Sequence, residues 1–485
     1  MKSRIRMCTT AMAIFTLLVI PVWVAAQQQQ KANKPRYKLI DLGTLGGPGS
    51  SFGPFNQVIL NEAGTAVGGA DTSTADPNYP NFSPFIAPNP LDPFIQHAFL
   101  WQNGVLTDLG SLPGTNSSYV NWVNASGVAA GNSENGSIDP LLGFPEVRAV
   151  VWNSGQMTDL GTLGGNESSA AAINRHGWVV GATTNSVSDT ACGLGTQCRA
   201  FLWDEKNGMR DIGTLGTGPD AFAVFVNDPG QVAGISLINT TDPFSHAFLW
   251  QNGSMQDLGT LGGNFSQPNY LNNQGQVVGS STLVGDAVTH PYLWDHGKLT
   301  DLGTFGGTSG SATWVNEAGE VVGDANQAGD VIHSAFLWKK GMLKNLGVVQ
   351  GDKCSTAYAI NSKGQIVGAS GLCGLPVHGF LWEKGHMIDL NSLIPPGVQL
   401  RFGININDHG EIAAVGKVPN SVDPDFYNLY DHAFLMIPCD ENHRDTAVCK
   451  DDGESAATQA VPAGHDASNP VLPLSRMRER YRHHN

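Results

Sequence analysis

Residues 246–275 read HAFLWQNGSMQDLGTLGGNFSQPNYLNNQG, and three short phrases in this stretch decide the fold. The first is HAFLW, which begins at His246. The second is DLGTLGG, which begins at Asp257. The third is an apolar residue followed by Asn-x-x-Gly, with Asn272 and Gly275 at its two ends. All three phrases recur along the chain, which is typical of a repeat architecture.

Each phrase, or a close variant of it, occurs eight times. The D-L-G phrase begins at Asp41, Asp108, Asp159, Asp211, Asp257, Asp301, Asn345 and Asp389. These copies are 67, 51, 52, 46, 44, 44 and 44 residues apart, so the period settles at 44 and the earlier units carry insertions. The asparagine of the third phrase stands at Asn61, Asn124, Asn174, Asn227, Asn272, Asn316, Asn361 and Asn407. The HAFLW-like phrase begins at His97, Arg148, Arg199, His246, His290, Ser334, His378 and His432.

The phrases predict turns between short strands. Asn-x-x-Gly has the preferences of a type I turn, because the Asn side chain bonds the backbone two residues on and Gly accepts the left-handed conformation that follows. Trp-x-x-Gly, as at Trp101 and Gly104, joins the HAFLW strand to the D-L-G strand as a tight hairpin. Two hairpins make a unit of about 44 residues, the four-strand size of a propeller blade. No segment has a sustained 3.6-residue apolar period, so few helices are expected.

The strands are apolar on both faces. Phe99 and Trp101 point one way, while Ala98 and Leu100 point the other. Burial on both faces fits a blade that is sandwiched between two neighbouring blades. The recurrent Trp is therefore interpreted as part of the core between blades.

The two ends of the repeat region favour a ring over an open solenoid. Residues 37–41 form a D-L-G strand without its hairpin partner, and residues 432–436 form an HAFL strand that also lacks one. Pairing them completes the last unit, whereas an open solenoid needs polar capping repeats, and none is visible. The sequence therefore predicts an all-β fold over residues 37–438: an eight-bladed β-propeller of four-stranded antiparallel blades, closed by its N- and C-terminal strands.

The flanking segments indicate export. Lys2, Arg4 and Arg6 precede an apolar run that ends in small residues at Ala25 and Ala26, which predicts a signal peptide over residues 1–26. Residues 27–36 are expected to be a linker, and residues 439–485 a disordered tail. No other stretch approaches a membrane-spanning length, so we expect no membrane span. Together with the signal peptide, this predicts a secreted protein, which we expect to be a monomer.

Without the signal peptide, six cysteines remain in three sequence-near pairs: Cys192 with Cys198, Cys354 with Cys373, and Cys439 with Cys449. In an oxidising compartment, disulfides between near neighbours are the natural interpretation, although the sequence leaves the other pairings open. None of the cysteines forms a C-x-x-C arrangement, which disfavours a zinc or redox site.

The charge balance excludes one class of partner. Loss of the signal peptide moves the formal net charge from −15 to −18. Nucleic acids and anionic lipids are bound through Lys and Arg, so we expect no nucleic-acid partner.

The phrases that begin at His97, His246 and His432 each read His-Ala-Phe, and they resemble the bacterial HAF-repeat family of extracellular repeat proteins. The resemblance covers residues 37–438. Three units depart from this pattern: Arg148 and Arg199 replace the His in two of them, and a third has Ser334 in place of the His and Asn345 in place of the Asp. The resemblance implies export and a repeat fold. It implies no particular activity, so the function stays open.

The repeated residues are interpreted as structural. The Gly-rich copies of residues 43–47 do not open a helix, as a phosphate-binding loop must. One His per unit stands too far from the next to share a metal, so a strand-end hydrogen bond is expected for the His and turn capping for the Asp. Because no Ser-His-Asp order, H-E-x-x-H or calcium loop stands out, we predict no catalytic residue, metal or cofactor.

The connection between the V-V-G strand and the next HAFLW strand differs most between units. Equivalent connections emerge on one face of a propeller, and variable loops on a rigid scaffold often bind ligands. The candidate binding residues in these connections are Tyr79, Phe82, Phe85, Phe94, Phe144, Phe244, Phe426, Tyr427 and Tyr430. The alternative interpretation is that each loop only pads the surface.

These patterns support two main functional hypotheses. The first is a binding or interaction scaffold for an extracellular glycan or protein. The alternative is an extracellular polysaccharide-acting hydrolase or lyase at the channel mouth, which requires two or three non-repeated carboxylate, His or Tyr side chains to converge there. A surface-structural role without a small ligand is a third possibility.

Overall fold

The structure is a computed structural model that describes residues 37–53, 57–79, 93–114, 116–189, 191–240, 244–419 and 431–439. Contacts divide the chain into two units, residues 1–450 and 451–485, and every described residue belongs to the first. The predicted signal peptide, linker and tail from residue 440 onward lie outside the described residues. So do Phe82, Phe85, Phe426, Tyr427, Tyr430 and Cys449.

Four strands recur in each unit. The first strands are β2 (Gly46–Ser51), β6 (Ser118–Val123), β10 (Gly164–Ile173), β14 (Ala221–Val226), β18 (Gly262–Leu271), β22 (Gly306–Val315), β26 (Cys354–Ile360) and β30 (Gln399–Ile406). The second strands are β3 (Ala66–Ala75), β7 (Ala129–Ile138), β11 (Val179–Ser188), β15 (Val232–Leu237), β19 (Val277–Leu283), β23 (Val321–Gln327), β27 (Ile366–Leu372) and β31 (Ile412–Lys417). The third strands are β4 (Phe94–Gln102), β8 (Pro145–Asn153), β12 (Thr196–Asp204), β16 (Ser245–Gln251), β20 (Thr289–Asp295), β24 (His333–Lys339), β28 (Leu375–Glu383) and β32 (Asp431–Pro438). The fourth strands are β5 (Val105–Gly110), β9 (Gln156–Asp159), β13 (Gly208–Asp211), β17 (Ser254–Asp257), β21 (Lys298–Asp301), β25 (Met342–Gly347), β29 (His386–Asp389) and β1 (Tyr37–Asp41).

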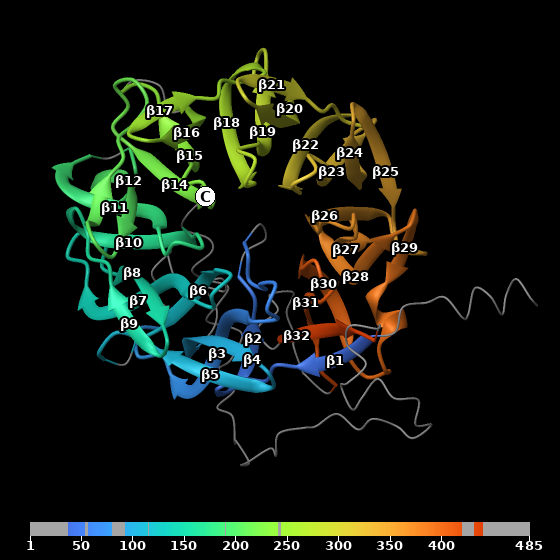
Figure 1. The fold of residues 1–485 in the computed structure, drawn as a ribbon, viewed down its shortest axis with the longest axis horizontal. Coiled ribbons are helices and arrows are strands. Elements are labelled where there is room, and N and C mark those ends of the chain that lie inside the picture. The colour runs from blue at the N-terminus through green and yellow to red at the C-terminus, as the bar shows by residue number, and fades with distance from the viewer. Residues whose placement is uncertain are drawn as a thin grey trace, which may run out of the picture. The chain divides into compact units, whose positions relative to one another are not determined.

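The described residues form an all-β fold, as predicted, and their one helix is the short 3-10 helix η1 (Leu390–Leu393). Six sheets have four strands each, and one sheet has eight. The eight-stranded sheet consists of two antiparallel four-stranded halves joined by one parallel pair, Thr289 with Ser309. Figure 1 shows the sheets following one another in the order of the chain. Nowhere in the described part of the chain is a helix long and apolar enough to cross a membrane.

The first and last described strands pair with each other. β1 runs antiparallel to β32, with Leu39 opposite Met436 and Asp41 opposite Phe434. Figure 1 shows β1 beside β32, in a sheet whose other strands, β31 and β30, come from the far end of the repeat region. The predicted pairing of the two orphan strands is confirmed.

The Trp-x-x-Gly phrases form tight hairpins. Gln102 pairs with Val105 across the first of them, and its central residues Asn103 and Gly104 have φ values of 51° and 85°. Positive φ at both central positions defines a type I′ turn, whose twist matches that of the strands it joins. The predicted hairpin is therefore confirmed, and the turn type explains why its second central residue is glycine.

The Asn-x-x-Gly phrases form the predicted turns between the first and second strands. The Asn61 Oδ1 atom accepts from the backbone N–H groups of Ala63 and Thr65, at 3.0 and 2.9 Å. The Gly64 N–H closes the turn on the Asn61 carbonyl at 3.1 Å. The same side chain also reaches the next unit, because Asn61 Nδ2 donates to the Asn124 carbonyl at 2.9 Å.

Phe and Gly of neighbouring strands pack together in the core of each sheet. Phe99, Phe201, Phe248, Phe336, Phe380 and Phe434 are all fully buried. A Cβ atom at Gly181 would lie 1.9 Å from the Ser169 carbonyl oxygen and 2.9 Å from the Phe201 ring, so only glycine fits under the ring. Trp101 and Trp152 are also buried, and Trp152 Nε1 donates to the Leu109 carbonyl of the preceding sheet at 3.0 Å. In these units the recurrent Trp belongs to the core between sheets, as predicted.

Candidate functional site

The repeated histidine and aspartate bind each other. His97 Nδ1 lies 3.0 Å from Asp108 Oδ2, across the hairpin that joins β4 to β5. Equivalent pairs at 2.8–2.9 Å are His246 with Asp257, His290 with Asp301, and His432 with Asp41. Burial opposes the ionisation of Asp108, but the hydrogen bonds from His97 and from the Gly110 N–H together outweigh it and lower the pKa of this carboxyl. The expected strand-end hydrogen bond of the His is confirmed in these units.

The repeated aspartate also caps the turn that follows it. Asp108 Oδ1 accepts from the Gly110 N–H at 2.7 Å, and Asp257 Oδ1 accepts from Gly259 at 2.7 Å. Asn345, which replaces the Asp in its unit, keeps this role by accepting from Gly347 at 2.8 Å. The predicted turn capping is confirmed.

The other four units lack the His–Asp pair, and two of them show what replaces it. Arg199 stands in the His position, and its Nε atom lies 2.8 Å from Asp211 Oδ2. His378 pairs instead with Asp352, from the β25–β26 connection, at 2.9 Å. The Asp389 side chain caps helix η1 through the Asn391 N–H at 2.9 Å. All of these side chains take part in hydrogen bonds at strand ends or turns.

The described candidate binding residues come from equivalent connections. Tyr79 and Phe94 flank the β3–β4 connection, Phe144 precedes β8, and Phe244 precedes β16. These connections all lie between a second and a third strand, so they share one end of the sheets. Phe244 is 39% exposed, and the other three side chains are half-buried. The other candidates, Phe82, Phe85, Phe426, Tyr427 and Tyr430, lie outside the described residues.

Buried carboxylates lie at the same end of the sheets. Glu134 Oε2 accepts from the Ser117 N–H at 2.8 Å, and burial raises the pKa of Glu134 to about 7. Glu167 Oε2 accepts from the Val147 N–H of the preceding sheet at 2.8 Å. Burial, reinforced by nearby acidic side chains, raises the pKa of Glu167 to about 8. The residues are only 2% and 4% exposed, so they serve as internal acceptors rather than groups that a substrate could reach.

An aromatic cluster, which the sequence patterns did not reveal, joins the first strands of several units. It consists of Trp122 (β6), Phe225 (β14), Tyr270 (β18) and Trp314 (β22). The Tyr270 ring stacks on Trp314 with centroids 3.8 Å apart, and it lies 5.8 Å from Phe225 and 6.5 Å from Trp122. Because its members come from four different units, the cluster ties together first strands that are not neighbours in the chain.

Acidic side chains of the Asn-x-x-Gly turns lie near this aromatic cluster. Burial is the main cause of the raised pKa of Tyr270, and the negative charges of Glu317 and Asp228 raise it further. These carboxylates already have turn partners: Asp228 Oδ1 accepts from the Arg175 N–H at 3.0 Å, and Glu317 Oε1 accepts from the Asn273 N–H at 3.0 Å. Each turn thus caps its neighbour.

Two of the three predicted disulfides are present. Cys192 is bonded to Cys198 and Cys354 to Cys373, with Cα atoms 5.8 and 5.1 Å apart. The third expected pair is not described, because Cys449 lies outside the described residues. Two disulfides fit a protein that matures in an oxidising compartment.

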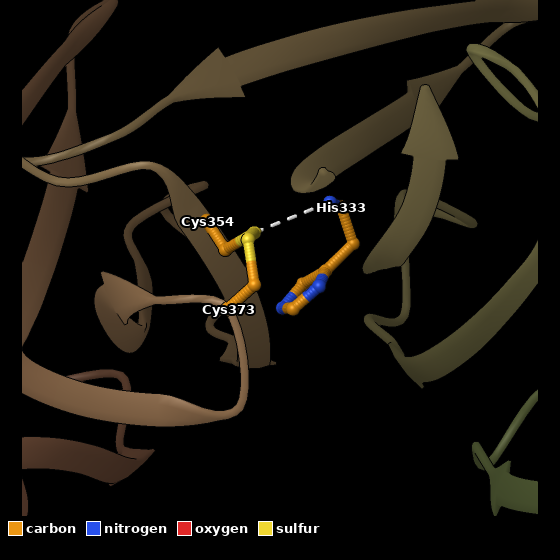
Figure 2. Close-up of side chains that lie close together, drawn as sticks. All are labelled: His333, Cys354 and Cys373. Atoms are coloured by element: carbon orange, nitrogen blue, oxygen red, sulfur yellow. Dashed lines mark hydrogen bonds between the residues drawn. A yellow bond between two sulfur atoms is a disulfide. The ribbon is translucent and has the colours of Figure 1, made fainter. Parts of the chain in front are cut away.

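A histidine lies against the second disulfide. Figure 2 shows His333 beside Cys354 and Cys373, with the His333 backbone N–H donating to Cys354 Sγ at 3.4 Å. One ligand atom from each of the three side chains lies within 4.8 Å of the other two. Burial lowers the pKa of His333. The sequence offered no signal for this cluster, since His333 belongs to the unit before the cysteines.

No family model matches the chain, and no curated protein matches it. Among solved structures, it is similar to the acylaminoacyl peptidase of Pyrococcus horikoshii, with 10% identity and a TM-score of 0.36, over 68% of this chain and 54% of that one. It is also similar to the β-propeller domain of the Trilobed protease from Pyrococcus furiosus, described as having an open velcro topology. There the identity is 7% and the TM-score 0.40, over 71% of this chain and 96% of that domain.

A third similar structure is one of two prolyl endopeptidases, with 10% identity and a TM-score of 0.43, over 66% of this chain and 50% of that one. The chain thus spans about half the length of the acylaminoacyl peptidase and of this endopeptidase. At these identities and TM-scores, no activity or substrate carries over to this chain.

Proposed function

We propose that the chain is a secreted binding scaffold of the HAF-repeat type. In this proposal, eight four-stranded units form the blades of a closed β-propeller. The connections between second and third strands then make one face, which binds an extracellular glycan or protein.

A circuit of hydrogen bonds supports the ring of eight units. The repeated asparagines donate from Nδ2 to the carbonyl of the next one in the order Asn61, Asn124, Asn174, Asn227, Asn272, Asn316, Asn361 and Asn407. Asn407 donates in turn to the Asn61 carbonyl at 3.1 Å, so the circuit returns to its start. The pairing of β1 with β32 supports the same closure.

The binding proposal rests on a difference between the repeated and the variable side chains. The repeated His, Asp and Asn side chains are engaged with one another and with the turns. The aromatic side chains that differ between units, such as Tyr79, Phe144 and Phe244, stand on the equivalent connections. Amphipathic rings on a rigid scaffold supply contact area at a low cost in conformational entropy, as in other recognition surfaces.

The hydrolase or lyase alternative needs accessible acids near neutral pKa. Glu134 and Glu167 have raised pKa values, but both are buried and accept backbone N–H groups. A glycoside hydrolase places two carboxyl groups on either side of a bound sugar, which buried acceptors of this kind cannot do. These two carboxylates therefore give no support to the catalytic alternative.

The test replaces the longest connection. The Asp76 N–H donates to the Pro93 carbonyl at 2.9 Å, so the two ends of the β3–β4 connection are adjacent and an Asn-Gly turn can replace residues 77–92. We expect this variant to lose at least about tenfold in affinity for a ligand found on glycan and extracellular-protein arrays, because it removes a large part of the variable face. Thermal unfolding checks that the variant is folded.

A matched control shortens a turn at the opposite end of the sheets, between Asp204 and Gly208, to an Asn-Gly hairpin. Binding is expected to survive this change. Unchanged affinity after replacement of residues 77–92, or loss of affinity only in the control, would contradict the proposal. If the bound polysaccharide is also cleaved, shown by release of shorter products, the enzyme alternative replaces it.

A further inference from the structure

The cluster of His333, Cys354 and Cys373 brings together three segments of two neighbouring units (Figure 2). His333 is the first residue of β24 and Cys354 the first residue of β26. Cys373 stands in the short turn between β27 and β28. His333 and Cys354 thus stand at the starts of strands, and each of these strands is paired with a neighbouring strand of its own sheet.

The three side chains carry the donor atoms that Zn²⁺ prefers. Zinc binds thiolate sulfur at about 2.3 Å and imidazole nitrogen at about 2.0–2.1 Å, so ligand atoms of a tetrahedral site stand roughly 3.5 Å apart. In this structure, one ligand atom from each residue lies within 4.8 Å of the others. The separation left to close is therefore about 1.3 Å at most. The disulfide blocks the site, because each sulfur is bonded to the other rather than free as a thiolate.

We propose that reduction of the Cys354–Cys373 disulfide converts this cluster into a binding site for Zn²⁺. A dithiol reductant supplies two electrons and two protons, becomes a cyclic disulfide, and leaves two cysteine thiols. Zn²⁺ then displaces the two thiol protons and forms two Zn–S bonds and one Zn–N bond, to His333. A water molecule fills the fourth position, as in zinc sites with three protein ligands.

The second described disulfide offers an internal comparison. Cys192 and Cys198 are also close in sequence and bonded. Among the described residues, the one three-residue group of His, Cys, Asp or Glu with this ligand geometry is that of His333, Cys354 and Cys373. Reduction of Cys192–Cys198 therefore frees two thiols without a third ligand, and such a pair binds zinc more weakly.

The test measures metal binding by purified protein in the Cys439→Ser/Cys449→Ser background. The protein is reduced with a dithiol under anaerobic conditions, freed of the reductant, and titrated with Zn²⁺ by calorimetry. In parallel, Co²⁺ titration reports thiolate-to-cobalt charge transfer and tetrahedral coordination. We expect one tight equivalent in the reduced protein and none in the oxidised protein.

Three variants assign the ligands. Cys354→Ser/Cys373→Ser should abolish the tight equivalent, and His333→Ala should weaken it by about tenfold or more, since one of three protein ligands is lost. The matched control, Cys192→Ser/Cys198→Ser, should bind like the parent protein. Circular dichroism confirms that each variant is folded.

The absence of a tight equivalent in the reduced parent overturns the proposal. Binding that is unchanged by His333→Ala, or lost in the Cys192→Ser/Cys198→Ser control, overturns it as well. Tight binding by the oxidised protein would also contradict it, because the disulfide leaves no thiolate to bind the metal.

Discussion

The repeated asparagine performs two tasks at once: it caps its own turn and bonds the next unit. The Asn227 Oδ1 atom accepts from the Gln231 N–H at 2.8 Å, while Nδ2 donates to the Asn272 carbonyl of the next unit at 3.0 Å. An ionised aspartate can accept but not donate. The side chain is almost fully buried, so water could not replace a hydrogen bond that a substitution removes.

Replacing Asn227 with Asp therefore tests the residue-scale argument. The change turns a donor into an acceptor that faces the Asn272 carbonyl, and it should lower the free energy of unfolding by about 2–4 kcal/mol. Urea unfolding followed by tryptophan fluorescence measures it. Asn252→Asp, in a hairpin turn outside the circuit, is the matched control and should stay within about 0.5 kcal/mol. Equal losses in both variants would contradict the role given to Asn227.

Glu167 predicts a pH dependence of stability. Its pKa is about 8 in the folded protein, against 4.5 for an ordinary glutamate, so between these values the folded state binds more protons than the unfolded state. Its contribution to stability is complete below about pH 4.5 and is lost as the pH rises toward 8. Glu167→Gln removes this dependence while keeping an acceptor for the Val147 N–H.

The free energy of unfolding of Glu167→Gln should exceed that of the parent by about 1–3 kcal/mol near pH 9, and the two should agree near pH 4. Denaturant titrations at a series of pH values measure the difference. The exposed Glu205→Gln serves as control and should show no such trend. If the free energies of unfolding of Glu167→Gln and of the parent differ by the same amount at every pH, Glu167 is not the cause of the pH dependence.

At the scale of the elements, hairpin turns were more predictable than the contacts between sheets. Trp-x-x-Gly predicts a tight hairpin, and Asn103 with Gly104 forms a type I′ turn. Lys340 occupies the position of Asn103 in another unit, with a φ of 51° that suits lysine poorly. The hairpin forms there because the flanking strands and Gly341 already specify it.

Lys340→Asn is therefore expected to stabilise the protein by about 0.5 kcal/mol, since Asn adopts this conformation more readily. Differential scanning calorimetry measures the rise in melting temperature. Lys339→Asn, one residue earlier and within β24, is the position control and should not stabilise. A lower melting temperature in Lys340→Asn would show that the left-handed conformation does not limit this turn.

Contacts between units could not be predicted from the sequence, and the reason is physical. The stacking of Tyr270 on Trp314 and the approach of Trp122 depend on how first strands of separate units meet. Local patterns specify a strand and its turn, but not what faces it across the molecule. His333 illustrates the same limit, because it meets Cys354 only when neighbouring sheets pack together.

At the scale of the whole molecule, repetition made the architecture predictable. Eight copies of three phrases and two complementary orphan strands predicted the four-stranded units and the pairing of β1 with β32. Repetition also limits functional prediction, because the phrases that stand out are the ones that build every unit. The variable connections carry the binding proposal, and five of the nine aromatic candidates lie outside the described residues.

In the proposed ring, one chain closes on itself by pairing its two end strands, β1 and β32. Lys38 lies directly opposite Ile437 in the β1–β32 pair, so Lys38→Cys/Ile437→Cys places two thiols on facing strands. After mild oxidation of the folded monomer, mass spectrometry of proteolytic fragments should find these two residues joined within one chain. The link should be absent after oxidation in urea, and Lys38→Cys/Val105→Cys should stay unlinked. A folded protein that remains unlinked, or that links only between two chains, would contradict the closed ring.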